Sequence, residues 1–300
     1  MTRSSASKKA RMPARDRRDL TTYAVAAYVF TWALWIPPLV YSAQSGWPLP
    51  SIAQGLGSWT GLTRLEIALA ACFQLAVYGP AVAALVMLLR GRNRSGLRPW
   101  AASIVRFRVP PKWYLFVVLA PLSLAAIVAA LGLALGGRLA LGGLPALGAL
   151  GIMVLGQVLT SGMEEPGWRG YALPLLQRTH TAENASWYLG LIWAGWHLPY
   201  MLYLYRGLPS WQLPLTLAGF TMSIIGMGYV HAWLYNSTGS VALNAILHGW
   251  ANVTNAVVAA VVLSPVVPLA TAGVTWLFVA WLFRRYGKKT LSSAPRGIGQ

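Results

Sequence analysis

The side chains of this sequence that could do chemistry are few, because six acidic residues and four histidines occur in 300 residues. Two of the acidic residues, Glu164 and Glu165, are adjacent within an otherwise mostly apolar run. His197 and His248 lie in separate apolar runs, and Asn252 follows His248 by four residues, on the same helical face. A buried carboxylate that takes a proton from water, with imidazole and amide donors for a developing oxyanion, is typical of hydrolysis.

The helical rise of 1.5 Å per residue places most of these groups at a common depth. Glu164, His197 and Asn252 lie roughly 17–18 Å from one end of their apolar runs, and His248 lies roughly 12 Å from it. His231, in a further run, lies only about 6 Å from the same face. We therefore expect the first four to converge in one layer and His231 to lie outside it.

Each polar residue also has a purely structural interpretation. Glu165 and Arg169 are four residues apart and could form a buried ion pair that neutralises both charges. The His231 side chain is interpreted as a group that makes a hydrogen bond between helices. Taken together the group favours function, since Pro166 and Gly167 interrupt the helix there, and such breaks are tolerated where a cavity or neighbouring groups satisfy the backbone.

Composition indicates the elements that must position these groups. The chain is 56% hydrophobic and 10% charged, with a mean hydropathy of +0.53, whereas a soluble domain carries about 25% charged residues. The apolar runs predict an all-α, polytopic membrane protein with about eight transmembrane helices in one bundle around a polar intramembrane site. The expected spans are 20–43, 65–89, 113–135, 150–176, 186–205, 213–235, 240–263 and 266–283.

The positive charge indicates orientation. Of the 24 Lys and Arg, all but Arg64, Arg138 and Arg206 fall in the terminal segments, the fourth span or alternate loops. Cytoplasmic loops carry such an excess, so we expect a multi-pass protein of the cell membrane with both termini cytoplasmic. The charge is accordingly interpreted as contact with anionic lipid, and no nucleic-acid partner is expected.

One bundle without a soluble domain is expected. Residues 1–19 and 285–300 are predicted to be basic, unstructured cytoplasmic tails. The transmembrane bundle then covers 20–284, with its catalytic core at 150–263. Most tryptophans are expected at the membrane interfaces. Four lie too close to the polar layer for that and are expected to wall a cavity: Trp168, Trp193, Trp196 and Trp250.

The motifs of this core resemble those of a known family. The runs EEPGWRG at 164–170, WAGWHLP at 193–199 and YNSTGSVALNAILHGWAN at 235–252 are similar, in this order, to the EExxxR, FxxxH and HxxxN motifs of the CPBP family. That family comprises the CAAX prenyl endopeptidases and bacteriocin-processing intramembrane proteases. The resemblance covers residues 155–255. Trp193 stands where the second motif usually has Phe, which affects cavity shape and substrate preference more than catalysis.

The resemblance implies a role for each motif residue. Glu164 with His197 would activate the attacking water, and His248 with Asn252 would stabilise the oxyanion. The remaining motif residues, which would order the site, are Glu165 and Arg169.

Participation of a metal is a separate question, because members of the family are often called metalloproteases. Two histidines and a glutamate could hold zinc with an open position, and that set would be Glu164, His197 and His248. Asn252, however, is an unusual zinc ligand and a good amide donor, and Glu165 would be the one carboxylate left to act as a base. We therefore expect no cofactor, with zinc as the alternative.

Two other classes of function fit parts of the pattern. A mid-membrane carboxylate with histidines suits a proton-coupled transporter, but the sequence has one broken helix without the repeated partner usual in transporters. A non-catalytic scaffold or bacteriocin-immunity protein would not need the complete polar set. We expect an intramembrane endopeptidase whose partners are a peptide or protein substrate and the lipid bilayer. The motifs leave open whether that substrate is prenylated.

Overall fold

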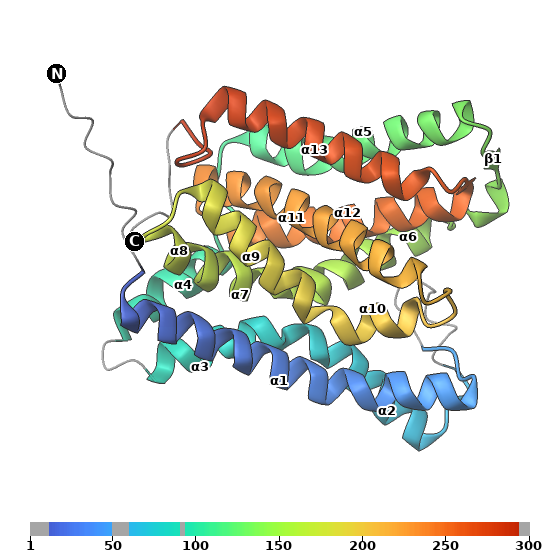
Figure 1. The fold of residues 1–300 in the computed structure, drawn as a ribbon, viewed down its shortest axis with the longest axis horizontal. Coiled ribbons are helices and arrows are strands. Elements are labelled where there is room, and N and C mark those ends of the chain that lie inside the picture. Colours follow the sequence, from blue (N-terminus) through green and yellow to red (C-terminus); the bar gives the residue numbers. More distant parts are fainter. Residues whose placement is uncertain (1–11, 50–59, 91–93, 294–300) are drawn as a thin grey trace.

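The computed structural model describes residues 12–49, 60–90 and 94–293, and these are mostly helical (Figure 1). The helices are α1 (Ala14–Ser45), α2 (Arg64–Leu75), α3 (Gly79–Arg90), α4 (Leu97–Ile104), α5 (Pro111–Ala134), α6 (Leu147–Leu159), α7 (Glu165–Gly167), α8 (Leu173–Gln177), α9 (Ala182–Trp196), α10 (Leu198–Leu204), α11 (Gln212–Thr238), α12 (Val241–Val261) and α13 (Val267–Tyr286). Shorter elements are the 3-10 turns η3 (Ala76–Tyr78), η4 (Arg94–Gly96), η5 (Leu141–Gly143) and η6 (Ser161–Glu164), the π-helical turn η7 (Trp168–Ala172), and the antiparallel pair β1 (Arg138–Leu139) and β2 (Val262–Leu263). The all-α prediction is confirmed.

Within the described residues, six helical stretches are long and apolar enough to cross a bilayer, and each coincides with an expected span. They are 14–45, 64–90, 111–134, 147–177, 212–238 and 267–286. The two other expected spans are helical as well. One is divided into α9 and α10 at His197, and the other is α12, whose apolar run is interrupted by His248 and Asn252. The chain is a multi-pass membrane protein.

Figure 1 shows the long helices side by side, with α1 and α3 along one side of the bundle and α5 and α13 along the other. The helices α9, α11 and α12, together with the segment from α6 to α8, lie between these two pairs. The polar residues singled out from the sequence therefore belong to the central helices.

Three basic segments that are distant in the sequence meet at one end of the bundle. Arg178, after α8, forms a 3.2 Å ion pair with Asp16 at the start of α1. The Ala182 N–H at the start of α9 donates to the Lys289 carbonyl, after α13, at 2.8 Å. Strand β1 and the end of α10 lie at the opposite end (Figure 1). The three basic segments are among those expected on the cytoplasmic side.

The expectation of unstructured tails is wrong for the described parts of both tails. Residues 14–19 form the first turns of α1. After α13, Leu291 is fully buried, and Asn236 of α11 donates from Nδ2 to the Thr290 carbonyl at 2.8 Å. Apolar contact and helix-end hydrogen bonds therefore order these basic residues. Residues 1–11 and 294–300 of the tails lie outside the described residues.

A tight turn sets the geometry of the central helices α11 and α12. Gly239 ends α11 in the left-handed conformation, with φ 65°. Ser240 then caps α12, its Oγ accepting the Leu243 N–H at 3.1 Å. Because the connection is so short, α11 and α12 run antiparallel, and residues at similar distances from Gly239 lie side by side.

Glycine allows α12 to approach the helix that precedes the two glutamates. A Cβ at Gly249 would lie 2.6 Å from the backbone nitrogen of Val158 in α6, closer than real Cβ contacts. Only glycine fits at that distance. The approach brings His248, which is adjacent to Gly249, toward the glutamates.

Candidate active site

The segment that carries both glutamates is an interrupted helix. After α6, Thr160 has φ −108° and ψ −90°, and the chain continues through η6, α7 and η7 before α8 begins. A π-helical turn of this kind is frequent at functional sites. The predicted interruption is confirmed, and it starts at Thr160, before Pro166 and Gly167. Because successive helical residues point about 100° apart, Glu164 and Glu165 face different partners.

Glu164 is held by two tryptophans. Its Oε2 accepts the Nε1–H of Trp193 at 2.7 Å and the Nε1–H of Trp168 at 3.2 Å. The residue is 3% exposed, and its side chain lines a cavity of about 430 Å³. A carboxylate at the wall of a cavity is positioned to exchange a proton with a bound water.

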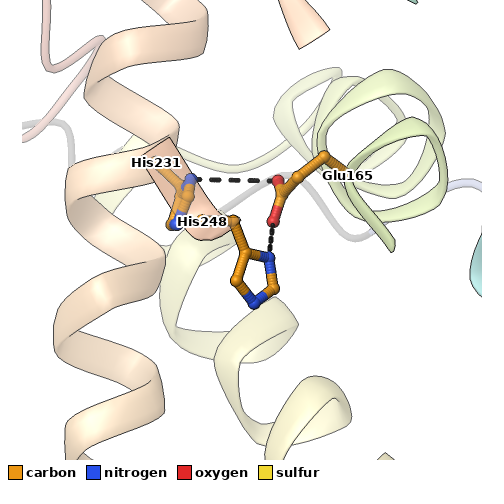
Figure 2. A group of neighbouring side chains, drawn as sticks. All are labelled: Glu165, His231 and His248. Atoms are coloured by element: carbon orange, nitrogen blue, oxygen red, sulfur yellow. Dashed lines mark hydrogen bonds and ion pairs between the residues drawn. The ribbon is translucent and has the colours of Figure 1, made fainter. Parts of the chain in front are cut away.

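Glu165 is the centre of a buried charged cluster (Figure 2). Its Oε1 accepts from Arg169 Nη1 at 3.0 Å and from His248 Nδ1 at 2.9 Å. Glu165 is 0% exposed and Arg169 is 1% exposed, so the ion pair considered from their spacing is present and fully buried. A carboxylate paired with a guanidinium acts as an acceptor, so His248 carries its proton on Nδ1. Figure 2 shows the other ring nitrogen of His248 pointing away from Glu165.

His231 belongs to this cluster, and its expected exclusion from the polar layer is wrong. Its Nδ1 lies 3.9 Å from Glu165 Oε2, and its ring centroid lies 5.7 Å from that of His248. The hydrogen bond between helices that was expected is also present, from His231 to Asn244 at 2.9 Å. The depth calculation treated each span separately. The turn at Gly239 was the missed signal, because His231 and His248 lie at nearly equal distances from it on antiparallel helices.

His197 lies at the break between α9 and α10 and lines the same cavity. Its Nδ1 is 2.9 Å from the Trp193 carbonyl. A carbonyl can only accept, so Nδ1 is the donor and Nε2 keeps its lone pair. The imidazole is packed against Phe220 and Trp196, with ring centroids 5.3 and 4.7 Å away. His197 is thus a fixed acceptor at the cavity.

Asn252 lines the cavity next to a residue that sequence reasoning missed. Its Nδ2 donates to Gln157 Oε1 at 3.1 Å, and Ser161 Oγ donates to the same oxygen at 3.1 Å. Gln157 of α6 is therefore a support for the Asn252 amide. Its polar side chain within a strongly apolar helix was the signal that could have found it.

The cavity therefore gathers all four residues expected to converge, together with His231. Of the tryptophans expected to form its wall, Trp193 does so, as does Trp35, which was not predicted. Trp168 and Trp196 are fully buried behind the wall. Trp250 faces α5 instead, where its Nε1–H donates to the Val118 carbonyl at 3.0 Å.

A different trio from the one expected has ligand atoms close enough for a metal. Among the residues that the structure describes, Glu165, His231 and His248 have one ligand atom each within 4.8 Å of the others. Glu165 and His231 thus take the places given to Glu164 and His197. Two buried atoms, Glu165 Oε2 and His231 Nε2, lack a hydrogen-bond partner in the described chain.

The donor set of this trio nevertheless does not fit zinc. The Asn244 amide donates to the Ser240 carbonyl, so its Oδ1 faces His231 and His231 Nδ1 donates. Both Nδ1 atoms near Glu165 therefore carry protons and cannot bind a metal in this arrangement. The other ring nitrogen of His248 points away from Glu165 (Figure 2). Arg169 is already paired with the carboxylate.

Comparison with known proteins concerns the segment that carries this site. Residues 146–254 match the family model described as type II CAAX prenyl endopeptidase Rce1-like. The match agrees with the resemblance of this segment to the CPBP family. Every CPBP motif residue named from the sequence falls within the matched segment, as do His231 and Gln157.

A similar curated protein is CAAX prenyl protease 2 of Methanococcus maripaludis, 31% identical over 98 residues. The match covers 30% of this chain and 35% of the relative, so the similarity concerns the CPBP core and about a third of the relative's length.

Proposed function

We propose that this protein is an intramembrane endopeptidase that hydrolyses a peptide bond of a membrane-associated peptide or protein. The observation that carries the proposal is the single cavity of about 430 Å³ lined by Glu164, His197, His248 and Asn252. A carboxylate, two imidazoles and a carboxamide around one cavity are the groups that hydrolysis needs.

Glu164 and His197 activate the attacking water. The free oxygen of Glu164 accepts a water proton while the water oxygen attacks the peptide carbonyl carbon, and His197 Nε2 accepts a hydrogen bond from the same water. The proton held by Glu164 then passes to the leaving nitrogen as the carbon–nitrogen bond breaks. The Trp193 carbonyl keeps the imidazole in the tautomer that this role requires.

His248 and Asn252 stabilise the negative charge that forms on the carbonyl oxygen. His248 donates from Nε2, with Glu165 compensating its charge from the Nδ1 side. Gln157 accepts one proton of the Asn252 amide, which leaves the second for the substrate. Glu165 and Arg169 act as ordering residues, because their ion pair fixes the imidazole that faces the cavity.

The reaction as proposed uses no metal. This is supported by the protonated Nδ1 atoms of His231 and His248 and by the Arg169 charge beside Glu165. The substrate reaches the site from the bilayer or its cytoplasmic face, and we propose eight spans with both termini cytoplasmic in the cell membrane. The three basic segments meet at one end of the bundle, and this supports that orientation.

The test is cleavage by purified protein in lipid vesicles. The substrates are a library of membrane-anchored peptides that includes C-terminally prenylated members, since the similar archaeal protein is named a CAAX prenyl protease. The wild type is expected to release new termini, and Glu164→Gln is expected to release none while eluting as the same folded species. Proton uptake by the vesicles without cleavage would support a transporter, and full cleavage by Glu164→Gln would remove Glu164 from the mechanism.

A further inference from the structure

One oxygen of Glu164 is saturated by indole donors. Trp193 of α9 and Trp168 of η7 both place their Nε1–H on Oε2, at 2.7 and 3.2 Å. A carboxylate oxygen has two lone-pair sites. Two donors therefore occupy Oε2, and Oε1 is the oxygen of this residue that lies outside the pair of bonds.

Neither indole can move easily. Trp168 is 0% exposed and packs edge-on against Tyr23 and Trp196, with ring centroids 5.8 and 5.9 Å away. Trp193 is 3% exposed, and the Arg169 guanidinium lies 4.4 Å from its ring centroid. A hydrogen bond from a rigid donor fixes the acceptor with little further loss of freedom.

The position of Trp193 makes it the organiser of the cavity wall. Its ring lies edge-on to His248 at 5.5 Å and 6.0 Å from His197, and its carbonyl accepts from His197 Nδ1. One residue thus contacts the water-activating carboxylate, its imidazole partner and the oxyanion imidazole. The motif that this part of the chain resembles usually has Phe here, and Phe has no N–H to donate.

We propose that Trp193, with Trp168 as a weaker second donor, is a positioning residue that holds Glu164 Oε2 so that Oε1 receives the proton of the attacking water. The inference rests on the proposed function, since it assigns an orientation to the base named there. The departure from Phe then changes the hydrogen bonding of the base as well as the shape of the cavity.

The experiment compares three Trp→Phe variants in the same vesicle assay. Trp193→Phe is expected to lower kcat roughly 10- to 100-fold, the effect of one hydrogen bond to a charged group, and to leave KM within about twofold. Trp168→Phe, which loses the longer bond, is expected to show a smaller loss of kcat. The control is Trp250→Phe, which removes an indole of α12 that faces α5 and whose N–H goes to the Val118 carbonyl at 3.0 Å.

A further readout separates positioning from folding. The vibrational band of the Trp193 indole N–H, taken as the difference between wild type and Trp193→Phe, is expected to shift in Glu164→Ala.

Each outcome bears on one of the two proposals. Inactive Glu164→Gln with Trp193→Phe as fast as Trp250→Phe would overturn the positioning role and leave the proposed function standing. A wild type that cleaves no peptide would overturn the proposed function itself, and an active Glu164→Gln would remove Glu164 from the mechanism and the positioning role with it. An unshifted indole band would show that the hydrogen bond is not formed, whatever the activity.

Discussion

Glu164 and Glu165 are consecutive in the chain, yet the two carboxylates have different hydrogen-bond partners. Glu164 accepts from two indoles, whereas Glu165 accepts from Arg169 and His248. Indoles carry no charge, so they leave Glu164 unpaired with any cation of the described chain and able to exchange a proton. Glu165 is paired within its cluster and holds His248, so its loss is expected to affect folding as well as the oxyanion imidazole.

The buried ion pair Glu165–Arg169 is expected to be costly to break by removing one partner and less costly to remove as a whole. Glu165→Gln leaves the guanidinium without its counter-charge and should lower the free energy of unfolding by about 3–5 kcal/mol. Arg169→Met should cost a similar amount. The double variant should lose less than the sum of the two, because neither charge is left alone. The measurement is thermal unfolding in detergent, and strictly additive losses would contradict the pairing.

The Asn252 amide is expected to matter for turnover rather than for stability. Asn252→Ala should raise the activation barrier by about 2.7–4 kcal/mol, the effect of removing one oxyanion donor elsewhere. Gln157→Leu, which keeps the size of the side chain and removes the acceptor, should slow turnover by a smaller factor of about 10. Both are read as kcat in the vesicle assay. An Asn252→Ala variant with unchanged kcat would exclude the oxyanion role.

Metal content gives a prediction independent of any substrate. Protein purified without chelators is expected to hold far less than one zinc per chain by elemental analysis, because the two Nδ1 atoms facing Glu165 carry protons. Activity is expected to persist after treatment with a strong chelator. One zinc per chain that is lost on His248→Ala would reverse this assignment.

Close approach of α12 to α6 predicts a strong steric effect at Gly249. Gly249→Ala places a Cβ 2.6 Å from the Val158 nitrogen, so a backbone must shift, at about 1–3 kcal/mol for overpacking. The control is Gly219→Ala on α11, where a Cβ meets nothing within 4 Å. The two unfolding temperatures decide the matter, and equal values would mean that the helices are not in contact at Gly249.

Hydropathy was enough to predict the eight helical segments, and the Pro166–Gly167 pair was enough to predict the interruption near the two glutamates. The break between α9 and α10 at His197 was not predicted. Helical spacing also indicated the Glu165–Arg169 pair and the shared face of His248 and Asn252. These are local relationships, readable from residues within a turn of one another. The convergence of Glu164, His197, His248 and Asn252 on one cavity followed from depth alone.

Relationships between helices were harder to predict. His231 was misplaced because its depth was measured along one span, while the antiparallel turn at Gly239 decides its neighbours. The hydrogen bonds from the indoles to Glu164 depend on which side chains of α9 face η6. Hydropathy does not predict this rotation of α9 about its own axis. The order of residues 288–293 likewise depends on contacts with α9 and α11 that a basic composition conceals.

The contact between α9 and the chain after α13 decides where the protein can be shortened or tagged. The first three N–H groups of α9 are satisfied by the Lys289 carbonyl, the Lys288 carbonyl and the Thr181 hydroxyl, in that order. Ending the polypeptide at the last residue of α13 would remove two of these acceptors and leave helix donors exposed at the start of the element that carries Trp193 and His197. A purification handle or a fluorescent fusion should therefore follow residue 293, because Lys288 and Lys289 cap the start of the central helix α9.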